Sequence, residues 1–371
     1  MDAIELVGSI TRLMKNLKSK SGINIKLVYT SISGDDITTK HSRAIIPLAE
    51  RGNKVITLSD IQRVNEQARV LGSSLEEEII QQEPYSYSID AKNNIVNPLG
   101  LYSHRLEVDL YLICAKLSSL QSLTRAINQS GYEIKDLFFS GLATSKAVFG
   151  NDFKEGLNIF CDIGSDITEL LIFRDGLLRD VEILPRGGDE LTAELQDNLK
   201  VTFELAEDLK RSHGIIGDSV QIAENKEILL KKENFYKPIK QRMVSEMITA
   251  KAKLIASGIK EAIEKKVSLY EVENLVVVGR TVLLEGFIET LENCLGVPVK
   301  LGRINNPEIL SLLKEDMTVS GHKYLMYLTA LGIICEAKAS KPLGILPLHQ
   351  PAKNLIHKTI NRFKEVYQEY F

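Results

Sequence analysis

Three closely spaced β-strand patterns followed by a glycine pair constrain this 371-residue chain more than any other feature. Residues 157–161, 167–174 and 177–184 each read as a mostly apolar strand. The first two are joined by a tight turn, Asp-Ile-Gly-Ser-Asp, and Asp175-Gly176 predicts a hairpin turn before the third. A helix is then expected from Gly187-Gly188-Asp189. A strand meander that leads into a helix predicts an α/β protein with helices layered on a sheet.

Helix and strand patterns alternate along the rest of the chain. Ser59 or Asp60 is expected to cap the second helix, and Asn93-Asn94 to form a turn. The periodicity predicts helices at about residues 4–17, 60–71, 117–129, 187–214, 239–267, from 283 onward, 321–338 and 355–371. It predicts strands at about residues 23–31, 43–58, 85–89, 106–115, 274–278 and 297–301, with a short hairpin within 218–236.

Composition and charge exclude several classes of protein. The formal net charge is −3, so there is no basic footprint for nucleic acid. The six histidines form no HxxxH or HExxH pair, and the four cysteines form no CxxC pair, so no metal site is expected. Widely separated cysteines suit core positions in a reducing cytoplasm. The sequence has no apolar run of about 18 residues, so no membrane-spanning helix is predicted.

The turn from Asp162 to Thr168 has the residues of a phosphate-binding hairpin. A tight turn between antiparallel strands exposes backbone N–H groups that can surround a phosphate. An aspartate at the end of a strand can hold a magnesium ion or its water. The alternative is a plain hairpin turn whose Asp and Gly serve the backbone geometry, and the turn by itself does not decide between the two.

Several motifs, in order, carry a resemblance to a known family. With the glycine turns at 187–189 and 279, the hairpin resembles the actin/Hsp70/sugar-kinase ATPase superfamily. Within it, the chain resembles the FtsA family of bacterial cell-division proteins. The stretches that carry this resemblance are Ile25–Gly34 (IKLVYTSISG), Asn97–Leu106 (NPLGLYSHRL), Ser140–Ser145 (SGLATS), Glu207 with Lys210 and Gly214, and Val276–Gly286 (VVVGRTVLLEG).

The resemblance implies an actin-like, ribonuclease H-like fold of two domains, with an FtsA-type inserted subdomain and a C-terminal amphipathic helix. The first domain is expected at residues 1–45 and 134–186, and the insert at 46–133. The second domain is expected at 187–317, with 213–272 as its upper subdomain. Residues 318–346 would return to the first domain, 347–352 would be a linker, and 353–371 the amphipathic helix.

The resemblance also implies a function in binding rather than catalysis. Family members polymerise head to tail, anchor FtsZ filaments to the inner membrane and recruit later division proteins through the inserted subdomain. This chain is therefore expected to be no enzyme, and to lie peripherally on the cytoplasmic face of the cell membrane at the division site. Its expected partners are the C-terminal tail of FtsZ, further copies of itself, later division proteins and membrane lipids, but not nucleic acid.

The family binds ATP with magnesium, and this chain departs from the family's phosphate motifs. The DIG-type hairpin that precedes the first helix in the family has no counterpart here, which indicates a misplaced start or a truncated copy. Ser165 and Asp166 replace two glycines of the second hairpin, and Arg280 follows Gly279. We therefore expect weakened or lost ATP binding. The remaining nucleotide positions are Asp162, Gly164, Ser165, Thr168, Gly187, Gly188, Asp189, Glu207, Lys210, Gly279 and Arg280.

The family's FtsZ-binding helix is only partly matched. There an Arg, a Glu and a second Arg hold an acidic, apolar peptide. Glu246 matches the Glu, Lys251 replaces the second Arg, and Arg242 lies one position from the first. Lysine lacks the bidentate geometry of arginine. From spacing alone, a solvated helix face is an equally good interpretation.

The last predicted helix is amphipathic. Its apolar residues share one half of the helix circumference, with Thr359 as the only polar one among them, and basic residues exceed acidic ones on the other half. Docking on the protein's own core is the common alternative, but the aromatic residues and the preceding proline-bearing linker favour a lipid surface. The expected membrane-binding residues are Leu355, Ile356, Ile360, Phe363, Val366, Tyr367, Tyr370 and Phe371, with Lys358 and Arg362.

Two alternatives remain open. A soluble ATPase or kinase of the same superfamily would need intact phosphate hairpins and a carboxylate that activates water. A pilus-assembly platform protein similar to PilM would share the architecture and bind a short partner peptide. The NPLG segment and the amphipathic tail favour the division scaffold.

Overall fold

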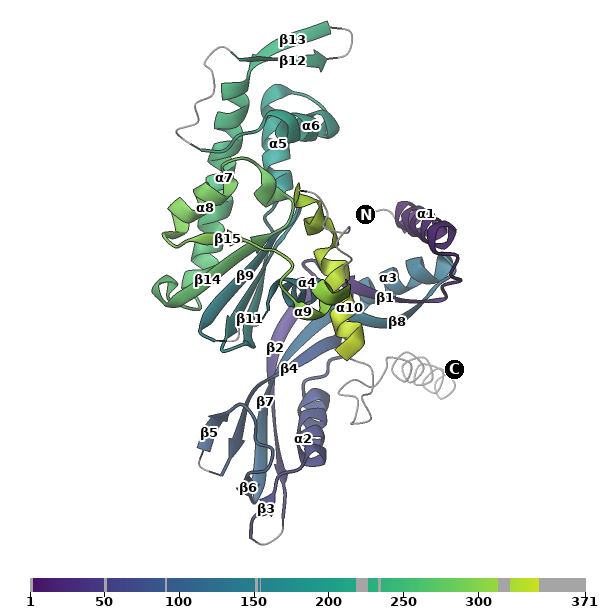
Figure 1. The fold of residues 1–371 in the computed structure, drawn as a ribbon, viewed down its shortest axis with the longest axis vertical. Coiled ribbons are helices and arrows are strands. Elements are labelled where there is room, and N and C mark those ends of the chain that lie inside the picture. The colour runs from purple at the N-terminus through teal and green to yellow at the C-terminus, as the bar shows by residue number, and fades with distance from the viewer. Residues whose placement is uncertain are drawn as a thin grey trace. The chain divides into compact units, whose positions relative to one another are not determined.

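The computed structural model describes residues 3–49, 52–90, 92–150, 153, 155–217, 226–232, 235–312 and 321–339. The chain forms two compact units (Figure 1). Unit 1 contains residues 1–143 and 330–371, and unit 2 contains residues 144–329. The predicted amphipathic tail, residues 353–371, lies outside the described residues, as does the linker before it.

Unit 2 is built on a five-stranded sheet in the order β11-β10-β9-β14-β15. The predicted meander is confirmed: β9 (Leu157–Ile163), β10 (Thr168–Arg174) and β11 (Leu177–Leu184) are antiparallel neighbours. Its second turn has φ of 53° at Asp175 and 73° at Gly176, the left-handed values that a two-residue hairpin needs. β14 (Val272–Val278) runs parallel to β9, and β15 (Val299–Leu301) runs parallel to β14.

This pairing corrects the predicted division of the chain. Residues 134–186 were expected to return to the first domain together. Instead β9, β10 and β11 belong to the same sheet as β14 and β15, so they lie in unit 2. The parallel β9–β14 pairing joins segments more than a hundred positions apart, and no local sequence pattern reports such a pairing.

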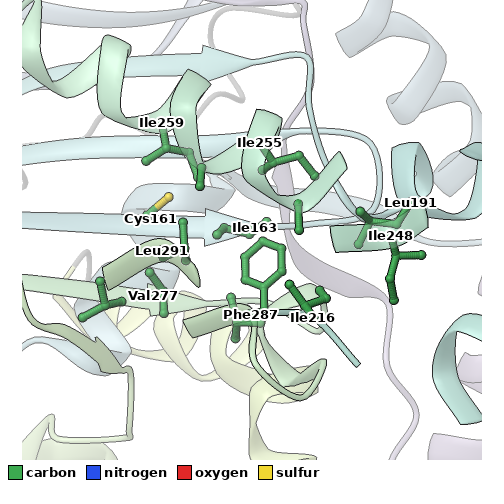
Figure 2. Close-up of a cluster of buried hydrophobic side chains, with 14 of the residues drawn as sticks. Cys161, Ile163, Leu191, Ile216, Ile248, Ile255, Ile259, Val277, Phe287 and Leu291 are labelled. Carbon is green, nitrogen blue, oxygen red and sulfur yellow. The ribbon is translucent and has the colours of Figure 1, made fainter. Parts of the chain in front are cut away.

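Helices cover this sheet and supply the main core of unit 2. α5 (Gly188–Leu199) packs on α6 (Phe203–His213) and on α7 (Gln241–Glu264), and α7 packs on α8 (Phe287–Leu295). Figure 2 shows side chains from β9, β14, α5, α7 and α8 gathered around the Phe287 ring. The smaller elements of unit 2 are β12 (Glu227–Lys232), β13 (Phe235–Lys240), η2 (Leu269–Glu271), η3 (Thr281–Leu283), α9 (Pro307–Leu312) and η5 (Gly321–Tyr327). The boundary between the two units falls within α4 (Ser140–Val148).

Unit 1 contains a four-stranded antiparallel sheet in the order β2-β7-β4-β5. Its strands are β2 (Ile37–Pro47), β4 (Glu77–Ile89), β5 (Lys92–Ile95) and β7 (Arg105–Lys116), and α2 (Leu58–Leu71) packs on β2 and β7. A two-stranded sheet, β3 (Lys54–Val55) with β6 (Tyr102–Ser103), lies beside it. The insert was expected at 46–133, but β2 pairs with β7 along its whole length from Ile37, so this sheet begins earlier.

Two local expectations in this sheet needed correction. Thr57, rather than Ser59 or Asp60, caps α2: its side chain accepts the Asp60 N–H, and the Asp60 carboxylate accepts the Thr57 N–H. Asn93-Asn94 is not a simple turn, because both residues lie in β5. Asn94 still has the left-handed φ of 60° that Asn tolerates.

The rest of unit 1 includes a parallel sheet of two strands. β1 (Leu27–Ile32) pairs with β8 (Glu133–Phe139). α1 (Ala3–Ser21) packs on α3 (Leu117–Gln129), and Gly22 follows the end of α1 with a left-handed φ of 69°. Every residue of β1 keeps some exposure to solvent.

One buried amide joins three distant segments of unit 1. The Gln81 side chain in β4 accepts the Phe139 N–H at 2.8 Å and donates to a carboxylate oxygen of Glu336 at 3.2 Å. Glu336 lies in α10 (Leu328–Ala339). Gln81 and Glu336 are both buried, so these hydrogen bonds fix β4 against the end of β8 and against α10.

Candidate nucleotide site

The predicted phosphate hairpin is a tight turn between β9 and β10. The Gly164 N–H donates to the Ile167 carbonyl oxygen at 2.9 Å, which closes the turn. Thr168 is fully buried, and its hydroxyl donates to the Arg186 carbonyl oxygen at 2.8 Å. Ser165 and Asp166 at the tip are exposed. Thr168 therefore supports the hairpin from inside, and the tip is the most exposed part of the turn.

The amino end of α5 is packed directly on this hairpin. The Gly188 N–H donates to the Gly164 carbonyl oxygen at 3.0 Å, and the Asp189 N–H donates to the Ser165 carbonyl oxygen at 2.8 Å. A Cβ at Gly187 would lie 2.3 Å from the Ser165 carbonyl oxygen. A glycine is therefore required at 187 for the two turns to approach each other.

A third turn, after β14, completes the arrangement. Gly279 has a φ of +96°, and a Cβ there would lie 2.2 Å from the Ile163 carbonyl oxygen and 2.9 Å from an Asp162 carboxylate oxygen. The Thr281 hydroxyl donates to the Gly164 carbonyl oxygen at 2.7 Å. The sequence interpretation missed Thr281; its only signal is its place directly after Gly279-Arg280. Arg280 itself is exposed.

The side chain of Lys210 in α6 is fully engaged in contacts within the protein. Its Nζ donates to the Gly188 carbonyl oxygen at 2.9 Å and to the Thr192 hydroxyl at 2.7 Å, and it forms an ion pair with Glu207. An ammonium group has three donors, and these partners use all of them. Lys210 therefore ties α6 to the first turn of α5 and has no donor left for a ligand.

Three carboxylates of the site differ in their affinity for protons. Burial raises the pKa of Asp162 to about 6. Burial also raises the pKa of Asp189. Burial alone would raise the pKa of Glu207, but hydrogen bonds from Lys210 and Thr192 hold it below its ordinary value. Glu207 is therefore firmly ionised within its network, whereas Asp162 is the carboxylate nearest to neutrality.

The residues present fit a triphosphate chain poorly. The N–H groups of Gly164, Gly188 and Asp189, which could bind phosphate oxygens, already donate to carbonyl oxygens. The exposed Asp166 carboxylate would repel a phosphate at the tip of the hairpin. For magnesium, Asp162 offers one carboxylate. Within the described ranges, no group of three or more His, Cys, Asp or Glu side chains could hold a metal ion.

The structure unites most of the predicted nucleotide residues and separates the predicted FtsZ-binding ones. Arg242 and Glu246 form an exposed ion pair on α7, with Arg242 Nε 2.8 Å from Glu246 Oε1. Lys251 lies nine residues after Arg242, about half a turn around the helix. Its Nζ is 3.6 Å from Glu194 Oε2 on α5, so it does not share a surface with the other two.

The predicted membrane-binding residues lie outside the described part of the chain. Among the helices that are described, none is both long enough and apolar enough to cross a membrane.

Two family models match this chain in consecutive regions. One, described as SHS2 domain inserted in FTSA, matches residues 34–114. The other, described as Cell division protein FtsA, matches residues 159–332. Together they cover more than half of the chain, and the first contains the four-stranded sheet of unit 1 except for the end of β7.

Curated relatives with the same description extend the match along the chain. Cell division protein FtsA of Borreliella burgdorferi is 24% identical over 298 residues, which cover 79% of this chain and 72% of that protein. Cell division protein FtsA of Escherichia coli is 22% identical over 349 residues, which cover 91% of this chain and 80% of that protein.

A solved structure supports the fold over most of the chain. The PilM-PilN type IV pilus biogenesis complex contains a chain that superposes with a TM-score of 0.58 at 14% identity, covering 90% of this chain and 85% of that one. At this identity the likeness concerns the fold alone. The predicted fold class, an actin-like α/β protein with an FtsA-type insert, is confirmed for the described residues.

Proposed function

Since this chain belongs to the FtsA family of cell-division proteins, we propose that it is a membrane-tethering scaffold of the bacterial division machinery. In this role it polymerises head to tail, anchors FtsZ filaments to the inner membrane and recruits later division proteins, while its nucleotide binding is weakened or lost. The observation that carries this proposal is that one chain contains both the actin-like sheet and the family's own inserted sheet. The N–H groups of Gly164, Gly188 and Asp189, which already donate to carbonyl oxygens, support the part on nucleotide binding.

The proposal for nucleotide binding rests on the hairpin tip. Titration of the protein with ATP and Mg²⁺ should give weak or undetectable binding. Replacing Ser165 and Asp166 together by glycine should tighten it about tenfold or more, because a repelling carboxylate is removed and the backbone can approach phosphate. Asp175→Gly, in the other hairpin of the same meander, is the matched control and should change nothing. Tight, magnesium-dependent ATP binding by the unaltered protein would contradict this part of the proposal.

The proposal for the membrane rests on the amphipathic pattern of residues 353–371. Flotation with anionic vesicles should carry the full chain but not a chain that ends at Leu348. Phe363→Asp or Phe371→Asp should release the full chain, because each puts a charge among residues expected at the lipid interface. Gln368→Asp adds the same charge to the polar face and should leave flotation nearly unchanged. Equal flotation of all these variants would rule out the tail as the anchor.

The proposal for FtsZ rests on the exposed Arg242–Glu246 pair of α7. An FtsZ tail peptide, acidic and apolar, should bind more weakly to Arg242→Ala when followed by fluorescence anisotropy. Lys251→Ala is the comparison, because Lys251 lies beside Glu194 on another side of α7 and should have little effect. A larger loss with Lys251→Ala would place the peptide between α5 and α7 instead.

A further inference from the structure

Residues 96–102, which lead from β5 into β6, expose most of their apolar side chains. Val96, Leu99, Leu101 and Tyr102 are each between 40% and 67% exposed. Val55 in β3 pairs with Tyr102 and is 39% exposed. We call these five residues the insert tip, because β3, β5 and β6 lie at one end of the insert's sheet (Figure 1). A group of exposed apolar side chains marks a binding surface more often than single exposed ones do.

Hydrogen bonds of the backbone hold the insert tip in one conformation. The Leu101 N–H donates to the Pro98 carbonyl oxygen at 3.2 Å, and Gly100 between them has a φ of +80°, as a type II turn requires. The Ile56 N–H donates to the Leu101 carbonyl oxygen at 2.9 Å, and the Ile56 carbonyl oxygen accepts the Gly100 N–H at 3.0 Å. Ile56 is 1% exposed. The turn is therefore fastened to a core residue, and the exposure of Leu99 at its corner is a property of the fold.

The side chains of the insert tip project in several directions. Val55 and Tyr102 are directly opposite each other in the ladder, so they share one face of the two-stranded sheet. Leu101 precedes Tyr102 and therefore faces the other side, since successive residues of a strand alternate. Leu99 lies at the corner of the turn. A groove or a flat partner surface contacts one face only, whereas a lipid interface surrounds an inserted turn from all sides.

Basic side chains outnumber acidic ones around the insert tip. Within the described residues of 52–63 and 90–105, the acidic ones are Asp60, which is buried and paired with Lys54, and Asp90, which is paired with His104. The exposed basic residues of the same segments are Lys54, Arg63, Lys92 and Arg105. Apolar side chains flanked by cations are complementary to a surface that is negatively charged outside and apolar within.

The opposite end of α2 has the opposite charge. α2 has 14 residues and so is about 20 Å long. Its first turn directly follows β3, and the segment after its last turn carries the consecutive glutamates of residues 76–78. Leu75 in that segment is 95% exposed but has no basic residue next to it in the sequence. This difference in charge along the insert favours the approach of the tip, and not of Leu75, to an anionic surface.

From these observations we infer that the insert tip binds the surface of an anionic lipid bilayer. The ring of Tyr102 and the side chains of Leu99 and Leu101 enter the headgroup region, a depth that suits aromatic residues. The flanking cations remain at the level of the lipid phosphates, where each strengthens binding about fivefold. The inference goes beyond the proposed function, because the tip is a different segment from residues 353–371 and can bind lipid whether or not those residues do. If both bind, their joint affinity exceeds that of either one.

Two protein partners are the other candidates for this surface. An acidic, apolar peptide would match the charge, but it would cover one face of the sheet of β3 and β6 and leave the rest of the tip exposed. A second copy placed tip to tip would bring the basic residues of both copies together, and like charges repel. An anionic bilayer is complementary to the charge and to all the apolar side chains at once, so the observations favour lipid.

A tryptophan reporter tests the inference directly. The chain contains no tryptophan, so Tyr102→Trp in the full chain introduces the only one. On vesicles of phosphatidylcholine and phosphatidylglycerol in equal amounts, we expect its emission to shift to shorter wavelength and to be quenched by brominated phospholipid. Leu75→Trp is the matched control, because Leu75 is also exposed and lies in the same insert but at the acidic end of α2. Its emission should remain that of a tryptophan in water.

Co-sedimentation with the same vesicles measures how much the tip contributes to affinity. Leu99→Asp should raise the lipid concentration needed for half-maximal binding of the full chain about tenfold, because a charge replaces a side chain that enters the interface. Arg105→Ala should raise it about fivefold on anionic vesicles and leave it unchanged on pure phosphatidylcholine. Leu75→Asp is the control and should have little effect. A chain that ends at Leu348 should bind only at roughly hundredfold higher lipid concentration, and Leu99→Asp should abolish that binding.

The alternatives give different results. An emission of Tyr102→Trp that is unchanged while the chain is bound to vesicles would overturn the inference and agree with anchoring by the tail alone. An emission shift that grows with protein concentration in the absence of vesicles would overturn it in favour of a second copy. A shift that the FtsZ tail peptide causes and vesicles do not would overturn it in favour of an acidic peptide. Equal vesicle binding by the full chain and by the chain that ends at Leu348, with the shift present in both, would support the inference and contradict the tail as the anchor.

Discussion

β9 in unit 2 and β1 in unit 1 are short, mostly apolar strands in very different surroundings. Six of the seven residues of β9 are buried and the seventh, Asp162, is partly buried, whereas none of the six residues of β1 is buried. β9 lies between β10 and β14, whereas β1 has one neighbouring strand among the described residues. The burial of a strand thus depends on its neighbours at both edges and on both faces, and its own sequence is a poor guide to it.

The largest expected difference between the two regions is in core packing. Phe287→Ala should lower the free energy of unfolding by about 3–5 kcal/mol, because it empties space around a ring that is 1% exposed. Leu27→Ala at the start of β1 should cost less than about 1 kcal/mol, because Leu27 is 43% exposed. Urea unfolding measures both, and equal losses would show that the β1 sheet is as well packed as the core of unit 2.

Two glycines with left-handed backbones sharpen the comparison. Gly279→Ala should cost about 2–4 kcal/mol, because its Cβ would collide with the Ile163 carbonyl in addition to the strain of φ +96°. Gly34→Ala, just after β1, has a φ of +126° but open space around a Cβ, and it should cost about 1 kcal/mol. The unfolding temperature of each variant, measured by calorimetry, tests this difference. A similar decrease for Gly279→Ala and Gly34→Ala would mean that the turn after β14 can move away from the hairpin.

Two aspartates should show opposite dependence on pH. The folded pKa of Asp162 is raised to about 6, so its contribution to stability declines as pH rises from about 4 through 6. Asp162→Asn should therefore stabilise the protein by about 2 kcal/mol at pH 8 and not at all near pH 3. Unfolding measured at several pH values, with the wild type at each, gives this difference; a stabilisation independent of pH would contradict it.

Asp36, after β1, provides the contrasting case. Hydrogen bonds from Lys116 and Ser119 lower the pKa of Asp36. The ionised carboxylate therefore stabilises the folded protein at pH values above the ordinary pKa, and this stabilisation is lost as the pH falls through the pKa of the folded state. Asp36→Asn should therefore destabilise slightly at neutral pH and have no effect in acid. Its side chain is 42% exposed, so the effect is smaller than that of Asp162→Asn.

The smallest effects are expected from exposed ion pairs, and here the two regions should agree. Arg174 Nη2 lies 2.8 Å from Glu271 in unit 2, and Lys116 Nζ lies 2.7 Å from Asp36 in unit 1. Arg174→Ala and Lys116→Ala should each change stability by less than about 1 kcal/mol. Thermal unfolding at low and high salt checks this. A large loss in either would mean that charge, and not burial alone, distinguishes the regions.

Local features of the fold could be predicted because nearby residues determine them. The Asp175-Gly176 turn and the helix α3 both follow from neighbouring residues. The cap of α2 was placed two or three residues too late, because Thr57, Ser59 and Asp60 are all good capping residues and the reciprocal bonds between Thr57 and Asp60 decide the matter. The sheet to which β9 belongs could not be predicted, because its partner β14 is distant in sequence.

In the candidate site, too, features set by nearby residues could be predicted, and features set by the packing of distant segments could not. Glycine turns at 187 and 279 were found because close approach requires glycine. The state of Lys210 was not predictable, since three partners from two helices use all its donors only after α5 and α6 have packed. The separation of Lys251 from Arg242 follows from the helical period, but the neighbour of Lys251, Glu194, comes from another helix.

The hydrogen bonds of Gln81 impose an order on the folding events that accompany synthesis of this protein. Gln81 and Glu336 are 255 positions apart in the sequence. At about 5–20 residues per second, a ribosome needs roughly 10–50 s to travel that distance. During this interval the emerging β4 carries an amide whose final partner does not yet exist, so water or a chaperone must serve in its place. The sheet of the insert can form early, but its attachment to α10 is among the last events of synthesis.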